Sequence, residues 1–319
     1  MSITVDWSSA GADLRSARCM SAEFCVLLES AHQQEPDGRW AVTETAVLAS
    51  GLAMGESPRW HGDRLWVCDW LAGEILTFDR AGNRQVMRMM TGLPFSIDWL
   101  PDQRLVVTSG STRQVWCEQP DGSLKRYGAM DRLWNEVVVD GRGYTFVNEI
   151  GFDMMAGEPP ATGTIAVVRP NGEMRQVAED LWFPNGMVVT PDDATLIVAE
   201  SHGNRLTAFD IGPDGELSNR RVWAELGDAA PDGLCLDAED AVWYADVPHQ
   251  RCVRVREGGA LLQTIEADRG CFACMLGGDD GRTLFIVATE WGGATMTGEG
   301  GRMGQILTAP VRVPHAGKP

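Results

Sequence analysis

Oxygen-bearing side chains recur along this 319-residue sequence, each at the start of a short apolar stretch. Five of the six starts carry such a side chain, and the starts are Glu56, Ser96, Asn135, Asn185, Asp232 and Ala273. The set offers two carboxylates, two amides and a hydroxyl, and it contains no His or Cys. Ligands of this kind suit Ca²⁺, Mg²⁺ or Mn²⁺ better than Zn²⁺. If these positions meet in space, they predict a site for a divalent cation.

The segments that follow these residues have a common pattern, seen most clearly at 183–201. There FPNGMVVTPDDATLIVAES contains an apolar strand, a turn rich in Pro and Asp, and a second apolar strand. This is the pattern of a β-hairpin. The hairpin returns every 39 to 50 residues, a period typical of a β-propeller with four short strands in each blade. The first strand of each blade lines the central channel, so the six starts are expected to converge on the axis.

Further strands between the hairpins complete the blades. The segments around 75–83, 115–127, 165–177, 206–217 and 252–264 each combine a strand, a turn with Gly and another strand. A strand of the outermost type at 44–57 precedes the first complete blade, and the strand at 306–313 lacks an outer partner. We therefore predict an all-β, six-bladed propeller whose N-terminal strand closes the ring and removes its open edges. Residues 1–40 are predicted to be an N-terminal extension with a short helix at 20–31, and residues 41–319 the propeller.

A second group of polar residues ends the second strand of each hairpin. Because that strand runs antiparallel to the first, its end is expected beside the start of the first strand. The group consists of Asp69, Ser109, Asn148, Glu200 and Asp246. Carboxylates crowded at one mouth of the channel would repel one another without a positive charge, which again indicates a cation.

Composition limits the possible partners. The net charge of −18 argues against binding to nucleic acid or to an anionic membrane. No apolar run approaches the ~18 residues of a membrane span, and no secretory pattern is visible at the N-terminus. The eight cysteines are scattered, several within apolar strands, as is typical of buried reduced thiols in a cytoplasmic protein. The oligomeric state is not predicted.

Several motifs together resemble one known family. They are GESPRW from Gly55, FPNG from Phe183, ESHGNRLTAFD from Glu200, PDGL from Pro231 and CFACMLGG from Cys271. In this order and spacing they resemble the family of senescence marker protein (regucalcin), gluconolactonase and luciferin-regenerating enzyme. The resemblance extends from about Val47 to Thr308.

The resemblance implies a six-bladed propeller with one divalent metal ion, held by Glu56, Asn185 and Asp232. Ca²⁺ is the first expectation, with Zn²⁺, Mn²⁺ and Mg²⁺ as alternatives. Asn135 matches the substrate-contacting Asn of the family, and Asn148 lies where members place a polar residue facing substrate or a water on the metal. Some sugar lactonases carry an Arg two residues before that Asn, where this chain has a Leu. Arg132, one residue earlier, is the candidate for this substrate contact.

The function implied is hydrolysis of a small lactone, sugar-type or related. The metal would polarise the carbonyl group and acidify a water molecule, and Asp232 would be the base that activates the water. The predicted apolar walls are Trp134, Phe152, Trp182, Phe183 and Met187, with Trp291 at the rim. Two other functions stay open: an esterase or phosphotriesterase at the same metal, and a calcium- or ligand-binding propeller without turnover. A plainer interpretation of the Asn-Gly and Asp-Gly pairs is ordinary turn formation.

Overall fold

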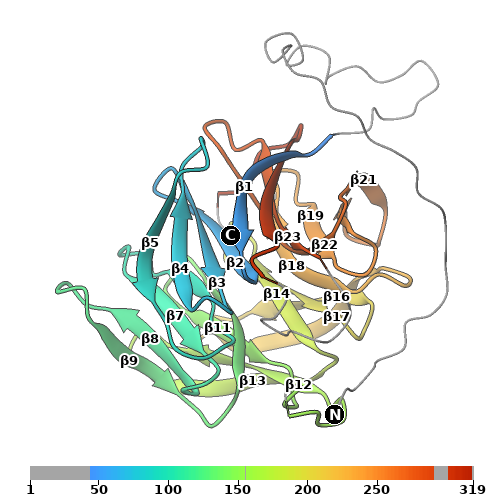
Figure 1. Ribbon diagram of the computed structural model, residues 1–319. Helices are drawn as coiled ribbons and strands as arrows, with labels where there is room; N and C mark the ends of the chain where they lie inside the picture. The colour runs from blue at the N-terminus through green and yellow to red at the C-terminus, as the bar shows by residue number, and fades with distance from the viewer. Residues whose placement is uncertain (1–43, 155, 291–300, 318–319) are drawn as a thin grey trace.

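Twenty-four β-strands form six four-stranded sheets in the computed structural model, which describes residues 44–154, 156–290 and 301–317. The strands within each sheet pair antiparallel, and the sheets are arranged as blades around a central axis (Figure 1). This is the predicted six-bladed propeller. In the part of the chain that the structure describes, no helix is long and apolar enough to cross a membrane.

Each blade runs from an inner strand at the axis to an outer strand at the rim (Figure 1). The inner strands are β2 (Gly55–His61), β6 (Ile97–Trp99), β10 (Trp134–Val139), β14 (Pro184–Val189), β18 (Pro231–Leu236) and β22 (Gly270–Gly277). The second strands are β3 (Arg64–Asp69), β7 (Leu105–Ser109), β11 (Thr145–Glu149), β15 (Thr195–Glu200), β19 (Val242–Asp246) and β23 (Thr283–Thr289). The third strands are β4 (Glu74–Phe78), β8 (Gln114–Glu118), β12 (Gly163–Val168), β16 (Arg205–Ile211), β20 (Arg251–Val255) and β24 (Gly304–Pro310). The outer strands are β5 (Arg84–Met89), β9 (Leu124–Ala129), β13 (Met174–Leu181), β17 (Leu217–Glu225), β21 (Leu261–Glu266) and β1 (Ala46–Leu52).

The closing blade joins the two ends of the propeller. β1 pairs antiparallel with β24, with Ala46 opposite Thr308 and Leu52 opposite Gly304. The first strand thus becomes the outer strand of the last blade, as predicted, and satisfies an edge that would otherwise be open. The predicted extension at residues 1–40, with its helix, lies outside the described residues, and the boundary near residue 40 stays a prediction.

The hydrophobic core lies between neighbouring blades. One buried cluster joins Val138 and Phe146 of the third blade to Val189, Leu196 and Phe209 of the fourth. Each such side chain contributes about 1.5–3 kcal/mol when removed from water, so every blade is stabilised by its neighbours. The six cysteines among the described residues are also buried and form no disulfide there, in agreement with the prediction.

Candidate metal centre

The inner strands leave regular pairing at the end that carries the predicted site residues. The shifts in register fall at 56–59 in β2, 134–137 in β10, 184–187 in β14 and 231–234 in β18. A bulge of this kind removes residues from the ladder and redirects their side chains. Asn135, Asn185 and Asp232 lie within the bulges of β10, β14 and β18, and Glu56 is the residue at which the bulge in β2 begins.

Glycine follows both Asn185 and Asp232 because the neighbouring inner strands come very close. A Cβ atom on Gly186 would lie 2.5 Å from the carbonyl oxygen of Asp232, and one on Gly233 would lie 2.4 Å from the Cβ atom of Ala273. Both glycines are inside strands β14 and β18. The Asn-Gly and Asp-Gly pairs are therefore strand positions at a close approach of two blades, which excludes the plainer interpretation as turns.

Replacing Gly186 by Ala is expected to destabilise the protein and disturb the centre, since the new methyl group meets the backbone of β18. Overpacking of this kind costs about 1–3 kcal/mol. Thermal unfolding with and without added Ca²⁺ would measure it. Gly122→Ala is the control, because open space surrounds that glycine and only its positive φ opposes a side chain. Equal losses of stability in the two variants, with equal responses to Ca²⁺, would contradict the view that Gly186 is required by the close approach of β14 and β18.

The three predicted metal ligands are brought together on the axis. The Asn185 side chain lies close enough to the Asp232 carboxylate to lower its pKa. Glu56 is 4% exposed, and burial, followed by repulsion from Asp232 and Glu136, raises its pKa well above the usual range. Burial and the charge of Glu136 likewise raise the pKa of Asp232. Two carboxylates that repel each other, one buried and one half-buried, favour a positive charge between them.

Two residues behind Asn185 fix its orientation. Its Nδ2 lies 3.3 Å from Ser201 Oγ, and that hydroxyl donates to the carbonyl oxygen of Pro231 at 2.7 Å. Asn148, fully buried at the end of β11, donates from Nδ2 to the carbonyl oxygen of Asn185 at 2.6 Å. Because the Asn185 amide nitrogen is engaged, its Oδ1 is available as a ligand. Asn148 thus orients Asn185, while its predicted contact with substrate stays a prediction.

Asn135 and Arg132 occupy different surroundings. Asn135 is 7% exposed, and its backbone carbonyl accepts a hydrogen bond from Ser96 Oγ at 2.6 Å. Within the described residues its side-chain amide has no hydrogen-bond partner, so it is available to a ligand. Arg132 is exposed, and its Nε lies 3.8 Å from Glu149 Oε1. The structure therefore places Arg132 at the surface beside β11, outside the buried centre.

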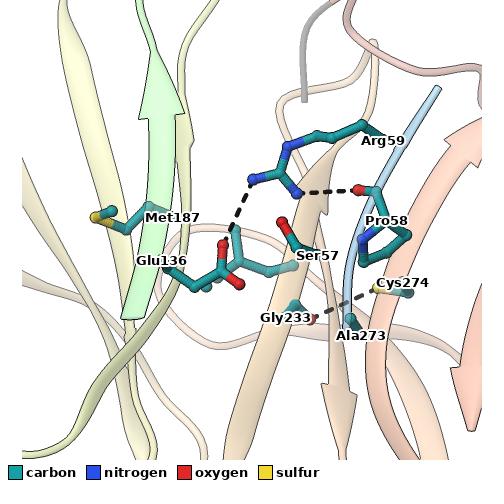
Figure 2. Close-up of a pocket in the computed structure, with 10 residues that line it drawn as sticks. Ser57, Pro58, Arg59, Glu136, Met187, Gly233, Ala273 and Cys274 are labelled. Atoms are coloured by element: carbon teal, nitrogen blue, oxygen red, sulfur yellow. Dashed lines mark hydrogen bonds and ion pairs between the residues drawn. The ribbon is translucent and has the colours of Figure 1, made fainter. Parts of the chain in front are cut away.

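Reasoning from the sequence missed two charged residues in the channel, Arg59 and Glu136. Both are at least nine-tenths buried, and they form an ion pair (Figure 2). Alternation along a strand predicts that Glu136 points away from the axis if Asn135 points toward it. The bulge removes that alternation. The signal that could have found them is a charge inside an otherwise apolar inner strand.

The second group of predicted polar residues lies beside the starts of the inner strands, as expected, with Asp69 opposite Gly55, Glu200 opposite Pro184 and Asp246 opposite Pro231. Asp69 accepts the backbone N–H groups of Ala53 and Met54. Glu200 pairs with Arg205 at 3.0 Å and Asp246 with Arg251 at 3.0 Å. These carboxylates anchor loops and are neutralised by their own arginines, so repulsion at the mouth involves the inner carboxylates only.

The predicted apolar walls are partly correct. Met187 lines a small axial cavity, and Phe152 packs edge-on against Phe183 with ring centroids 5.8 Å apart. Trp134 instead lies in the core between two blades, and Trp182 is 45% exposed. Trp291 is outside the described residues.

Another buried carboxylate, Asp98, ties β6 to β10. Its Oδ2 accepts the backbone N–H of Val139 at 2.6 Å, and its Oδ1 accepts that of Trp99 at 2.8 Å. Burial raises the pKa of Asp98 to about 6. The folded state therefore holds this proton more tightly than the unfolded state. The contribution of protonated Asp98 to the free energy of unfolding is complete below about pH 4 and is lost as the pH rises through 6.

Asp98→Asn is expected to change the pH dependence of stability in a defined direction. The variant cannot ionise at this position, so its stability should improve relative to the wild type between pH 4 and pH 7. The free energy of unfolding of the variant should rise relative to the wild type by on the order of 2–3 kcal/mol, because the pKa of Asp98 is raised by about two units. Thermal unfolding of both proteins across this range measures it, and melting curves that shift in parallel with pH would contradict it.

Comparison with known proteins bears directly on this arrangement. The family described as the SMP-30/Gluconolactonase/LRE-like region matches residues 54–290. The chain belongs to this family. The matched region contains Glu56, Asn135, Asn185 and Asp232, so all the residues gathered at the axis are within it.

Individual members of the SMP-30/Gluconolactonase/LRE-like family are distant in sequence. Bovine regucalcin is 25% identical over 264 residues, which cover 77% of this chain and 86% of regucalcin. The structure of a calcium-binding protein, regucalcin, from Agrobacterium tumefaciens has a TM-score of 0.71 at 20% identity and covers 88% of this chain and 98% of that one. A gluconolactonase from Xanthomonas campestris has a TM-score of 0.67 at 23% identity, with 85% and 90% covered. These two structures share the fold described above.

Proposed function

We propose that this protein is a metal-dependent hydrolase that opens the ring of a small lactone, sugar-type or related. The observation that carries the proposal is the meeting of Glu56, Asn185 and Asp232 on the axis, where the buried carboxylate of Glu56 and the half-buried carboxylate of Asp232 repel each other. Membership of the SMP-30/Gluconolactonase/LRE-like family supports a lactonase-like activity.

The donor set fits a divalent cation. Two carboxylates and the Oδ1 of Asn185 are hard oxygen ligands, the kind that Ca²⁺ prefers. The A. tumefaciens regucalcin is a calcium-binding protein, which supports Ca²⁺ as the first choice, and Zn²⁺, Mn²⁺ and Mg²⁺ are alternatives for the experiment. When bound, a divalent cation would polarise the lactone carbonyl group and acidify water.

The side chains at the centre have distinct tasks in ring opening. Asp232 accepts a proton from the attacking water while the water oxygen bonds to the carbonyl carbon. The bond between that carbon and the ring oxygen then breaks, and the proton passes to the released oxygen, giving a hydroxy acid. The Asn135 amide donates a hydrogen bond that orients the lactone or stabilises the developing oxyanion. Asn148 keeps Asn185 in place. Arg132 contacts the polar part of the substrate from its position at the surface beside β11.

The proposal is tested with chelator-treated protein and a pH-indicator assay. The panel contains sugar lactones, aliphatic lactones, aryl esters and a phosphotriester, each assayed after addition of Ca²⁺, Zn²⁺, Mn²⁺ or Mg²⁺. We expect turnover of at least one lactone that requires added metal. Turnover confined to esters or phosphotriesters would favour the alternative hydrolase, and metal binding without any turnover would favour a binding propeller.

A further inference from the structure

A buried ion pair spans the channel next to the candidate metal centre. Arg59 of β2 and Glu136 of β10 are 6% and 5% exposed, and Arg59 Nη2 lies 3.5 Å from Glu136 Oε2. The same nitrogen donates to the carbonyl oxygen of Val137 at 2.7 Å, and Nη1 donates to that of Pro58 at 2.9 Å. Figure 2 shows the guanidinium group directed at the Glu136 carboxylate. Two backbone contacts therefore fix the position of the arginine.

The side-chain partners hold Glu136 only weakly, and a backbone contact at Val137 adds to them. The ion pair of 3.5 Å is long, and the second partner, Ser96 Oγ at 3.1 Å, also lies 2.6 Å from the carbonyl oxygen of Asn135. A hydroxyl group has a single proton to donate, so it serves one acceptor at a time. The Nε atom of Arg59 is buried without a partner among the described residues. Arg59 thus keeps unused hydrogen-bonding capacity, and the side-chain contacts of Glu136 are long or shared.

The Glu136 carboxylate acts on the centre without belonging to its ligand set. Its negative charge repels both Glu56 and Asp232. In the described part of the chain, however, no three acidic, His or Cys side chains gather closely enough to hold one metal ion. A cavity lined by Arg59, Glu136, Gly186, Met187 and Gly233, with room for about one water molecule, lies on the axis beside them.

We propose that Arg59 and Glu136 are a positioning pair that sets the cation affinity of the axial centre. The inference rests on the proposed metal-dependent function. The negative charge of Glu136 strengthens the attraction for a divalent cation, and the fixed guanidinium group of Arg59 offsets that charge and keeps the carboxylate out of the ligand set. The two residues therefore act on cation affinity in opposite directions, which a merely structural pair would not do.

The test is calorimetric titration of chelator-treated protein with Ca²⁺ and with Mn²⁺. Glu136→Gln keeps the shape and removes the charge, so the Kd should increase by about 10- to 100-fold, the usual effect of an outer residue on metal affinity. Arg59→Met should lower the Kd, and Arg59→Lys, which keeps the charge, should leave it within about threefold of the wild type. The Arg59→Met/Glu136→Gln double variant has no unpaired buried charge at this place, and its Kd should fall between those of the single variants.

Four results would overturn the inference. One is a Glu136→Gln variant with wild-type affinity, and another is weaker binding in both single variants. If Arg59→Met does not fold, the double variant decides, since a Kd no lower than that of Glu136→Gln would show that Arg59 does not offset the charge. A wild-type protein that binds no divalent cation would overturn the proposed function as well, whereas the other outcomes leave that function intact.

Discussion

Asp232→Asn is expected to lower kcat/KM for the lactone by about 10²- to 10⁴-fold, the usual contribution of a general base. The substitution keeps an oxygen that can serve as a ligand and keeps the size of the side chain, but it removes the group that accepts the proton of water. Cation binding should therefore survive far better than turnover. Turnover in the indicator assay and the calorimetric Kd for Ca²⁺, measured on the same protein, separate the two effects.

The matched control is Asp63→Asn, in the exposed turn between β2 and β3. Asp63 has a positive φ of 57°, which Asn tolerates as well as Asp does, so this variant should retain full activity. An Asp232→Asn protein with wild-type turnover would remove Asp232 as the base. Loss of turnover together with complete loss of cation binding would assign Asp232 a ligand role only.

Glu56→Gln is expected to have opposite effects on the metal-free and the metal-bound protein. In the absence of a cation, the charge of Asp232 repels the buried carboxylate of Glu56, so removing one charge should raise the Tm. In the presence of Ca²⁺ the same substitution removes a ligand charge. Breaking a buried charge pair costs about 3–5 kcal/mol, so the Kd should increase at least 100-fold and the Tm gain from Ca²⁺ should disappear.

Thermal unfolding of wild type and Glu56→Gln, each with chelator and with excess Ca²⁺, measures all four states. A useful control is Glu44→Gln, at an exposed position before β1, which should change neither Tm. If Glu56→Gln lowered the Tm equally with and without Ca²⁺, the residue would be a structural carboxylate and the proposed ligand set would be wrong.

The fold could be predicted because its determinants are local and repeated. Short apolar strands, separated by Gly, Pro and Asp turns, recur at intervals of 39 to 50 residues, and that recurrence sets both the number of blades and the inner strand of each. The closing strand was predictable for a related reason: β1 has the pattern of an outer strand before any blade exists for it. The places of Glu56, Asn185 and Asp232 at the starts of inner strands followed from equivalent positions in this repeat, whereas their role as metal ligands came from the family resemblance and stays a prediction.

The rest of the site depends on deviations from the repeat. The bulge in β10 turns Glu136 toward the axis beside Asn135, whereas ideal alternation would turn it away. The partners of Glu200 and Asp246 are arginines on third strands, and pairings between strands are not contained in the pattern of any one strand. Trp134 adjoins the site in sequence, yet it packs between blades. Such features depend on tertiary contacts that a single sequence does not display.

The proposed metal centre is tested most directly by anomalous diffraction from crystals grown with Mn²⁺, with data collected at the manganese edge. We expect one strong anomalous peak on the propeller axis, within coordination distance of Glu56, Asn185 and Asp232, and no such peak in crystals of Glu56→Gln. A fully loaded protein whose only peak lies away from these three side chains, or a channel without any peak, would contradict it.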